Sequence, residues 1–256
     1  MHRAAHTLRI CLSLLTGALL IWQLSLFATG SRVEVANSWF NAGYALVFMA
    51  SALLGFTAHK RRYISGAQGK ALWFFSLGSL SFAIALLIYA YSGIVLNVAT
   101  PFPSSADLFF TFYIISAGAG CFAILELLGP VMTRKVVTQS IVAAFLVFCV
   151  TFAFLVYPAL TLTKVPLIQF FTVTYPILAC ALMTLILIIA RSSAGSSAHS
   201  LKLYFISLSF LAVGLILFLY RHNSGTYWNG DITDFFCMMS GYMSGLAAIE
   251  LGWGEA

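Results

Sequence analysis

Long apolar segments alternate with short polar connections along the whole chain. A run of about 20 mostly apolar residues is long enough to cross the hydrocarbon layer of a membrane as an α-helix. We therefore expect an all-α integral membrane protein, a bundle of eight transmembrane helices. Because the connections are too short for a soluble unit, residues 1–256 should form a single domain. The predicted spans are Thr7–Phe27, Phe40–His59, Leu72–Tyr91, Leu108–Leu128, Val136–Val156, Leu167–Ala190, Leu203–Tyr220 and Thr233–Leu251.

The distribution of positive charge predicts how the helices are oriented. The chain is 61% hydrophobic and only 8% charged, and its 13 Lys and Arg residues fall mainly in alternate connections. Lys and Arg resist translocation across the membrane, so the basic side should be cytoplasmic, with both termini inside. The cytoplasmic set is Arg3, Arg9, Lys60, Arg61, Arg62, Lys70, Arg134, Lys135, Arg191 and Lys202, against Arg32, Lys164 and Arg221 outside. The net charge of +6 then reflects topology and contact with anionic membrane lipids, and we expect no nucleic-acid partner.

Several chemistries lack the residues they need. The histidines lie at helix ends or in connections, which excludes a haem held by two histidines inside the bundle. No lysine lies in the middle of a span, where a retinal Schiff base would need one. The cysteines form no CxxC pair and lie within or at the ends of spans, where small apolar packing residues are common. We therefore expect no catalytic residues, no metal and no cofactor in this chain.

Two predicted helices carry carboxylates with the same spacing. Asp107 precedes one helix and Glu126 closes it 19 residues later, and Asp231 and Glu250 stand in the same relation around the last helix. Nineteen residues of helix rise about 28 Å, so each pair should place one carboxylate at each face of the membrane. Glu126 and Glu250 either serve a structural role, snorkelling or pairing with Arg134, Lys135 or Lys202, or have a coupling or proton-linked role.

The same spacing suggests an internal duplication. Upstream of the two carboxylate helices, Ser92-Gly93-x-x-x-Asn97 is echoed by Ser224-Gly225-x-x-x-Asn229. Both observations predict a 4+4 repeat, residues 1–129 and 130–256, with the two halves in the same orientation because each contains an even number of spans. Chance similarity between apolar helices is the alternative.

Small residues at helical spacing predict close helix contacts. Gly241 and Gly245 form a GxxxG pattern on the last helix, and Ser116 and Gly120 form a similar pattern on the fourth. Such residues let helix backbones approach closely in membranes. We expect both helices at the centre of the bundle; use of these surfaces in a homodimer is the alternative that we favour less.

Polar and aromatic side chains gather on the predicted outer side. Carboxylates, a guanidinium and an imidazole beside aromatic rings suit a small polar ligand, and a histidine also titrates near neutral pH. The alternative is that these charges are solvated and that the aspartates cap helices. The candidate ligand-binding residues are Asp107, Arg221, His222, Tyr227, Trp228, Asp231 and Asp234.

Three stretches resemble a known family of membrane regions. Pro101-Phe-Pro-Ser-Ser-Ala-Asp107-Leu-Phe-Phe, Tyr175-Pro176, and the segment from Gly225 through Gly241-Tyr242 carry the likeness. They are similar to the multi-spanning input region that precedes GGDEF, EAL or histidine-kinase domains in bacterial signalling proteins. The resemblance implies a sensor of an extracytoplasmic or lipid-borne cue in the bacterial cytoplasmic (inner) membrane.

The chain also departs from that family. Leu178 and Ala179 stand where members often carry an aspartate, and Phe235 and Phe236 stand where a tryptophan is usual. The family's cytoplasmic output domain would begin after Ala256, and catalysis, if any, would belong to it.

We therefore expect a non-catalytic signal-input module for an unknown small ligand, with helices four and eight relaying the signal. Its partners would be membrane lipids and a cytoplasmic output domain or partner protein. The alternatives are a small-molecule transporter and an accessory subunit of a larger membrane complex.

Overall fold

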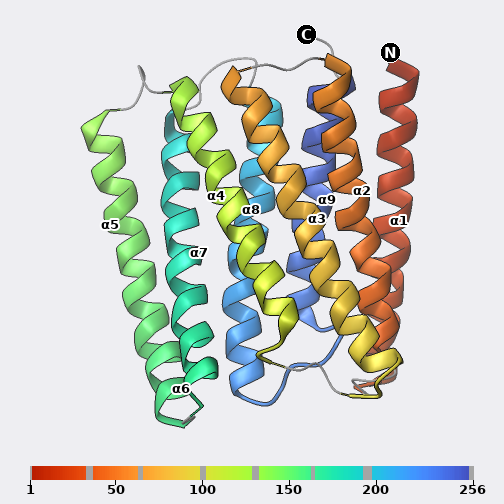
Figure 1. Ribbon diagram of the computed structural model, residues 1–256, viewed down its shortest axis with the longest axis vertical. Helices are drawn as coiled ribbons and strands as arrows, with labels where there is room; N and C mark the ends of the chain where they lie inside the picture. The colour runs from red at the N-terminus through yellow and green to blue at the C-terminus, as the bar shows by residue number, and fades with distance from the viewer. Residues whose placement is uncertain are drawn as a thin grey trace.

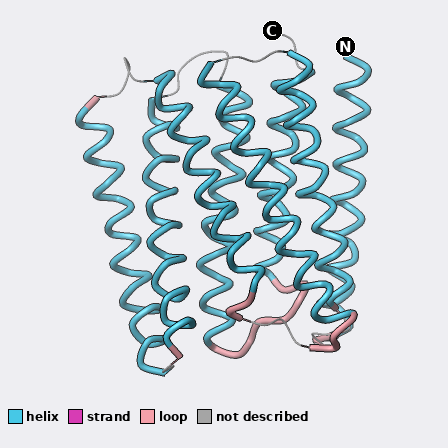
Figure 2. The backbone as a smooth tube through the Cα atoms, in the orientation of Figure 1, coloured by secondary structure: helices cyan, strands magenta, loops and turns pink. Residues whose placement is uncertain are grey.

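The computed structural model describes residues 2–32, 37–62, 66–98, 102–128, 133–162, 165–192 and 198–253. These residues form helices and short connections, and no strand occurs among them (Figure 1, Figure 2). The helices are α1 His2–Thr29, α2 Ser38–Arg62, α3 Gly66–Ile94, α4 Ser105–Leu128, α5 Arg134–Thr151, η2 Phe152–Val156, α6 Tyr157–Leu162, α7 Pro166–Ser192, α8 Ala198–Asn223 and α9 Ile232–Trp253. Pro101, Lys164 and Ala256, which enter the sequence analysis, lie outside the described residues.

The prediction of an all-α bundle is confirmed. Within the described residues, eight helices are long and apolar enough to cross a membrane, and each contains one of the predicted spans. The fifth span differs in detail, because α5 continues into one π-helical turn, η2, and then into the short helix α6. Pro158 lies in the first turn of α6, where the missing amide donor of proline is tolerated.

Six helices form a closed, flattened ring. α2, α3, α4, α7, α8 and α9 contact one another in that order, and α9 closes the ring against α2. The remaining two long helices lie outside it. α1 packs on α9 and α2, and α5 packs on α7, so that α1 and α5 stand at opposite edges of the bundle (Figure 1). Large apolar side chains on the outer faces of α1 and α5 are exposed, as expected of helices that face lipid.

The start of α1 and the end of α9 lie at the same end of the bundle (Figure 1). An even number of spans requires this arrangement. The opposite end carries the connections 95–98, 102–104 and 224–231, and we call it the loop end. Its assignment to the outside of the cell rests on the charge pattern and stays a prediction.

The order of the ring helices is compatible with a duplication. If residues 1–129 match 130–256, then α2, α3 and α4 match α7, α8 and α9, and this exchange maps the ring onto itself. The two helices outside the ring do not match in their packing, because α1 packs on α9 and α2, whereas among the described residues α5 packs on α7 and not comparably on α4, the counterpart of α9. One part of the sequence pattern does not fit: Ser92-Gly93 lies inside α3, whereas Ser224-Gly225 follows the end of α8. The repeat therefore gains support from the helix order and none from that echo.

Small residues mark close contacts of α9, as predicted. A Cβ atom at Gly241 would lie 3.1 Å from the ring of Phe48 on α2, and one at Gly245 would lie 2.7 Å from Leu12 on α1. The expectation of a central position is wrong for α4. Gly120 does pack closely on Phe75 of α3, but the opposite face of α4 is exposed, because ring helices keep one side toward lipid. The exposed side chains on α4 are Leu108, Phe112, Ile115 and Phe122.

Candidate functional site

The predicted site residues meet at the loop end of the ring, and their carboxylates are buried. Asp107 and Asp231 are 0% exposed and Asp234 is 2% exposed. The reading in which these are solvated loop charges is therefore wrong. Burial of a carboxylate is costly unless hydrogen bonds or a counter-charge compensate it, so the partners of each aspartate decide what it can do.

Two of these carboxylates organise the starts of helices. The Asp231 carboxylate Oδ1 accepts a hydrogen bond from the Thr233 amide at 2.7 Å, which is the geometry of a helix N-cap on α9. On α4 the cap is Ser104, whose Oγ accepts from the Ala106 amide at 3.1 Å. Asp107 reaches back and accepts from the Ser104 amide at 2.6 Å, which completes a reciprocal capping arrangement.

This geometry changes which residues are equivalent between α4 and α9. Asp107 is the third residue of α4, and Asp234, not Asp231, is the third residue of α9. Asp234 also reaches back, because its Oδ2 accepts from the Gly230 amide at 2.6 Å. The pairing of Asp107 with Asp231 in the sequence analysis is therefore displaced by one helical turn from the structural correspondence.

Asp107 and Asp234 each accept a hydrogen bond from a tyrosine. The Tyr175 hydroxyl on α7 donates to Asp107 Oδ1 at 2.6 Å, and the Tyr227 hydroxyl donates to Asp234 Oδ1 at 3.2 Å. Burial raises the pKa of Tyr227, and the charge of Asp234 raises it further, so this phenol remains a donor. Across the described part of the chain, no basic side chain lies within 4.0 Å of either carboxylate.

Asp231 differs because it has a cationic neighbour. Arg221 Nε at the end of α8 lies 2.5 Å from Asp231 Oδ2, and a second guanidinium nitrogen donates to the Thr226 carbonyl at 2.9 Å. Burial raises the pKa of the Asp231 carboxyl, while the hydrogen bonds of Thr233 and the charge of Arg221 oppose the rise. The ion pair consequently holds the connection 224–231 across the end of the ring.

The connection is also held by two buried amides that the sequence analysis did not single out. Gln23 on α1 donates from Nε2 to the carbonyls of Gly230 and Asp231 at 3.0 and 2.6 Å. Asn41 on α2 donates to the Asn229 side chain at 3.0 Å. Gly230 adopts φ of +99°, a conformation that favours glycine. In the sequence, Gln23 and Asn41 are polar residues inside otherwise apolar spans, and this signal could have identified them.

The two remaining candidates have mainly packing roles. The His222 ring lies half-buried against Phe102 and Phe218, with ring centroids 4.7 and 5.6 Å apart. Trp228 is buried and contacts the Phe27 ring edge-on at 5.0 Å. The Trp228 carbonyl accepts a hydrogen bond from the Asp231 amide at 3.1 Å. Among the described contacts, neither the His222 side chain nor the Trp228 side chain touches a carboxylate of the three aspartates.

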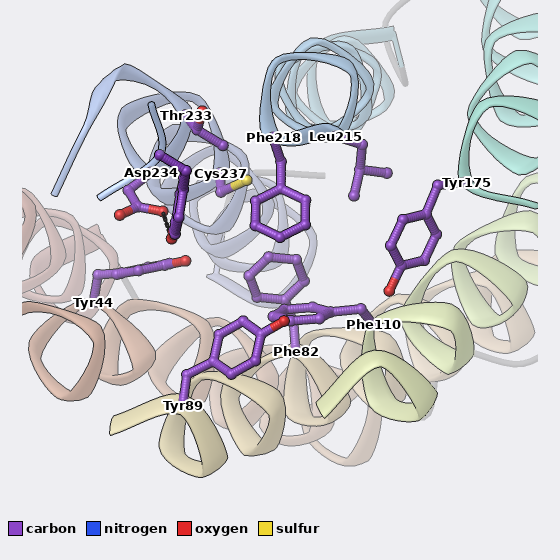
Figure 3. A pocket seen from close by; sticks show the side chains of 11 residues that line it. Tyr44, Phe82, Tyr89, Phe110, Tyr175, Leu215, Phe218, Thr233, Asp234 and Cys237 are labelled. Carbon is purple, nitrogen blue, oxygen red and sulfur yellow. Dashed lines mark hydrogen bonds between the residues drawn. The ribbon is translucent and has the colours of Figure 1, made fainter. Parts of the chain in front are cut away.

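A small cavity lies beneath the connection 224–231, at the centre of the ring (Figure 3). Every ring helix contributes to its wall, and α1 and α5 contribute nothing. Its free volume for a water-sized occupant is about 30 Å³. Asp234 and Cys237 of α9 and Leu215 of α8 line it together with seven aromatic side chains. These are Tyr44, Phe82, Tyr89, Phe110, Tyr175, Phe218 and Tyr227.

Among the described residues, two in the wall have a buried hydroxyl without a hydrogen-bond partner, Tyr89 on α3 and Thr233 on α9, which also lines the cavity. Tyr89 is 3% exposed. In Figure 3 the Tyr89 hydroxyl points toward the Phe82 and Phe110 rings at the middle of the cavity. Buried polar atoms are normally paired, so these hydroxyls mark polar points in a largely aromatic wall. Of these wall residues, the sequence analysis named only Tyr227 and Asp234 as candidate ligand-binding residues.

The two glutamates lie at the opposite end with partners other than those predicted. Glu250 pairs with Arg9 of α1 at 2.7 Å, and His199 lies 4.0 Å away. Glu126 pairs with Lys70 of α3 at 3.7 Å, and both side chains are more than 60% exposed. The expected pairing with Arg134, Lys135 or Lys202 is therefore wrong, because Arg9 of α1 and Lys70 of α3 are the partners.

No protein-family model, curated protein or solved structure matches the chain. The resemblance to bacterial signal-input regions consequently stays a prediction, and the proposed function rests on the geometry of the site.

Proposed function

We propose that the protein is a membrane signal-input module that binds a small extracytoplasmic ligand in the cavity at the loop end of the ring. The observation that carries this proposal is a largely aromatic cavity walled by all six ring helices and containing a buried carboxylate, Asp234. An occupant of this cavity touches every ring helix, so it can change how the helices pack against one another.

The interior beyond the cavity favours binding over conduction. Phe48 and Phe82 stack at 4.1 Å directly beside the cavity wall, and Phe75 and Tyr204 stack at 4.3 Å farther along the ring. Leu211 and Met238 are 0% exposed. Stacked rings and close-packed aliphatic side chains leave no continuous polar path, so the cavity is blind on its inner side.

α9 is the natural element to carry a signal from the cavity. Its first turn places Asp234 in the cavity wall. Its last turn carries Glu250, which pairs with α1 at the other end of the bundle. Midway, Ser240 accepts from the Ser207 hydroxyl through its carbonyl at 2.8 Å, and the Tyr113 hydroxyl lies 3.5 Å from Ser240 Oγ. A ligand transmits a signal only if it binds two arrangements of these contacts with different affinity.

The coupling can be tested by filling the cavity. Leu215→Trp places a large side chain at the cavity wall. Val213→Trp places the same side chain on the exposed face of the same helix. We expect the first variant, and not the second, to change hydrogen exchange of backbone amides around Glu126 and Glu250. Equal exchange at that end in both variants and the unmodified protein would contradict a signalling role for the cavity.

A transporter is the second candidate, and the order of the ring helices favours it. Two equivalent halves around a central site are typical of many transporters, in which the halves rock to expose the site alternately. If the protein takes a ligand up into proteoliposomes and Asp234→Asn abolishes that uptake, the protein is a transporter and not an input module. Binding without uptake would support the input module.

A further inference from the structure

The cavity contains a carboxylate that no cation balances. The described donors around the Asp234 carboxylate are all neutral: the Gly230 amide, the Tyr227 hydroxyl and the facing Tyr44 hydroxyl. Arg221 is engaged with Asp231 in the connection above. A carboxylate offers about four acceptor positions, so Asp234 has capacity for a further donor inside the cavity.

The unpaired hydroxyl of Tyr89 is an independent sign of a missing partner. It belongs to α3, on the side of the ring opposite to the start of α9, and it points into the cavity (Figure 3). A phenol oxygen accepts hydrogen bonds as well as donating them. A ligand with several N–H groups bound at Asp234 can reach the Tyr89 hydroxyl through one bridging water, since the cavity has room for two or three water-sized groups.

The aromatic wall selects the sign of charge of the ligand. Ring faces attract cations, and cages of aromatic rings recognise ammonium groups. Phe82, Phe110 and Phe218 surround the middle of the cavity beside the carboxylate (Figure 3). Hard metal ions instead require several oxygen ligands, and the described residues hold no group of three or more His, Cys, Asp or Glu suited to a metal.

The volume limits the size of the ligand. About 30 Å³ of free space accommodates two or three water-sized groups, since a single water needs roughly 10–15 Å³ by this measure. Ammonium and methylammonium fit within that limit, and tetramethylammonium does not fit without displacing the rings.

We infer that the cavity binds ammonium or a small primary alkylammonium ion, held by Asp234 and the aromatic faces and linked through a water to the Tyr89 hydroxyl. This assignment rests on the proposed function, because it names the class of ligand for the same cavity.

The test is equilibrium binding of radiolabelled methylammonium to the full chain in lipid nanodiscs, at fixed neutral pH and ionic strength. We expect saturable binding that ammonium displaces and that neither potassium nor tetramethylammonium displaces. Potassium competing as well as ammonium would overturn the assignment, since it would indicate a site selected by charge alone.

Three variants locate the binding. Asp234→Asn should weaken it about tenfold or more, because a charge-assisted hydrogen bond is lost. Tyr89→Phe, which keeps the ring and removes only the hydroxyl, should weaken binding about three- to tenfold. Glu126→Gln, the same carboxylate-to-amide change at the exposed end, should bind like the unmodified protein. Unaltered binding in folded Asp234→Asn or in Tyr89→Phe would refute this site.

The outcomes separate this inference from the proposed function. If methylammonium binds as described but leaves hydrogen exchange around Glu126 and Glu250 unchanged, the ligand class stands and the signalling role fails. If methylammonium shows no saturable binding while Leu215→Trp still alters that exchange, the cavity is coupled to the far end and the ligand class is wrong.

Discussion

Acidic side chains are held in opposite ways at the two ends of the bundle. At the loop end, Asp107, Asp231 and Asp234 are almost fully buried and their hydrogen bonds come largely from backbone amides and tyrosines. At the other end, Glu126 and Glu250 remain accessible and pair with flexible basic side chains. Buried polar groups in a membrane protein are expensive and mark functional sites by default. The comparison supports the proposal that the loop end, and not the opposite end, binds a ligand.

Removing the cation beside Asp231 should have the largest effect on the contrast between the two ends of the bundle. Arg221→Ala should lower the free energy of unfolding by about 3 kcal/mol at neutral pH, because it leaves a buried carboxylate without its partner. Unfolding in mixed detergent micelles measures the loss. Arg221→Lys, which keeps the charge, should lose clearly less, and equal losses in both variants would show that the charge is unimportant.

The deficit of Arg221→Ala should also depend on pH in a defined direction. Burial already raises the pKa of Asp231 and Arg221 opposes that rise, so the variant has a higher folded-state pKa still. A carboxyl with a raised folded-state pKa contributes stability that is present below its unfolded pKa, about 4, and is lost as pH rises through the folded pKa. The difference between the variant and the unmodified protein should therefore shrink toward pH 4; a constant difference would contradict the ion-pair explanation.

Backbone geometry at the loop end gives the next effect. Gly230→Ala should destabilise the protein by about 2 kcal/mol, because φ of +99° is strained for alanine and its Cβ would lie 2.9 Å from Leu26. Gly30→Ala is the control: its φ is +65° and nothing lies within 4 Å, so about 1 kcal/mol is expected. Thermal unfolding of both variants measures the difference, and a larger loss at Gly30 would contradict the tight closure of the connection.

Removing one hydroxyl probes the buried environment of Asp107. Tyr175→Phe should cost about 1.5 kcal/mol, since a buried carboxylate loses a 2.6 Å hydrogen bond. Tyr157→Phe on the exposed face of α6 is the matched control and should change stability little. The same equilibrium unfolding serves for both, and indistinguishable variants would place Asp107 in a wetter site than described.

The smallest effect is expected at the opposite end. Glu126→Gln should change the free energy of unfolding by about 0.3 kcal/mol, because exposed ion pairs contribute little. Equilibrium unfolding can set only an upper bound on so small a change in the free energy of unfolding. A loss comparable with that of Arg221→Ala would remove the contrast between the two ends.

The sequence predicted the eight spans because apolar length alone decides whether a helix crosses a membrane. It also identified Asp234 and Tyr227, which are polar groups near a helix start. It missed Tyr44 and Tyr89, because a helix that is apolar on all sides has no polar stripe to show which face points inward. It misjudged the exposure of Asp231, because burial depends on Gln23, more than 200 residues away in the chain.

That distance has a consequence for biogenesis. α2 precedes α9 by most of the chain, yet the ring closes only where these two helices meet. During synthesis, Gln23 and Asn41 enter the membrane with their amides unpaired, and their partners at Gly230, Asp231 and Asn229 emerge almost last. Unsatisfied amides in hydrocarbon carry a substantial free-energy penalty. Nascent chains that have not yet acquired α9 therefore present a polar defect in their first two helices, a recognisable mark of incompleteness for membrane quality control.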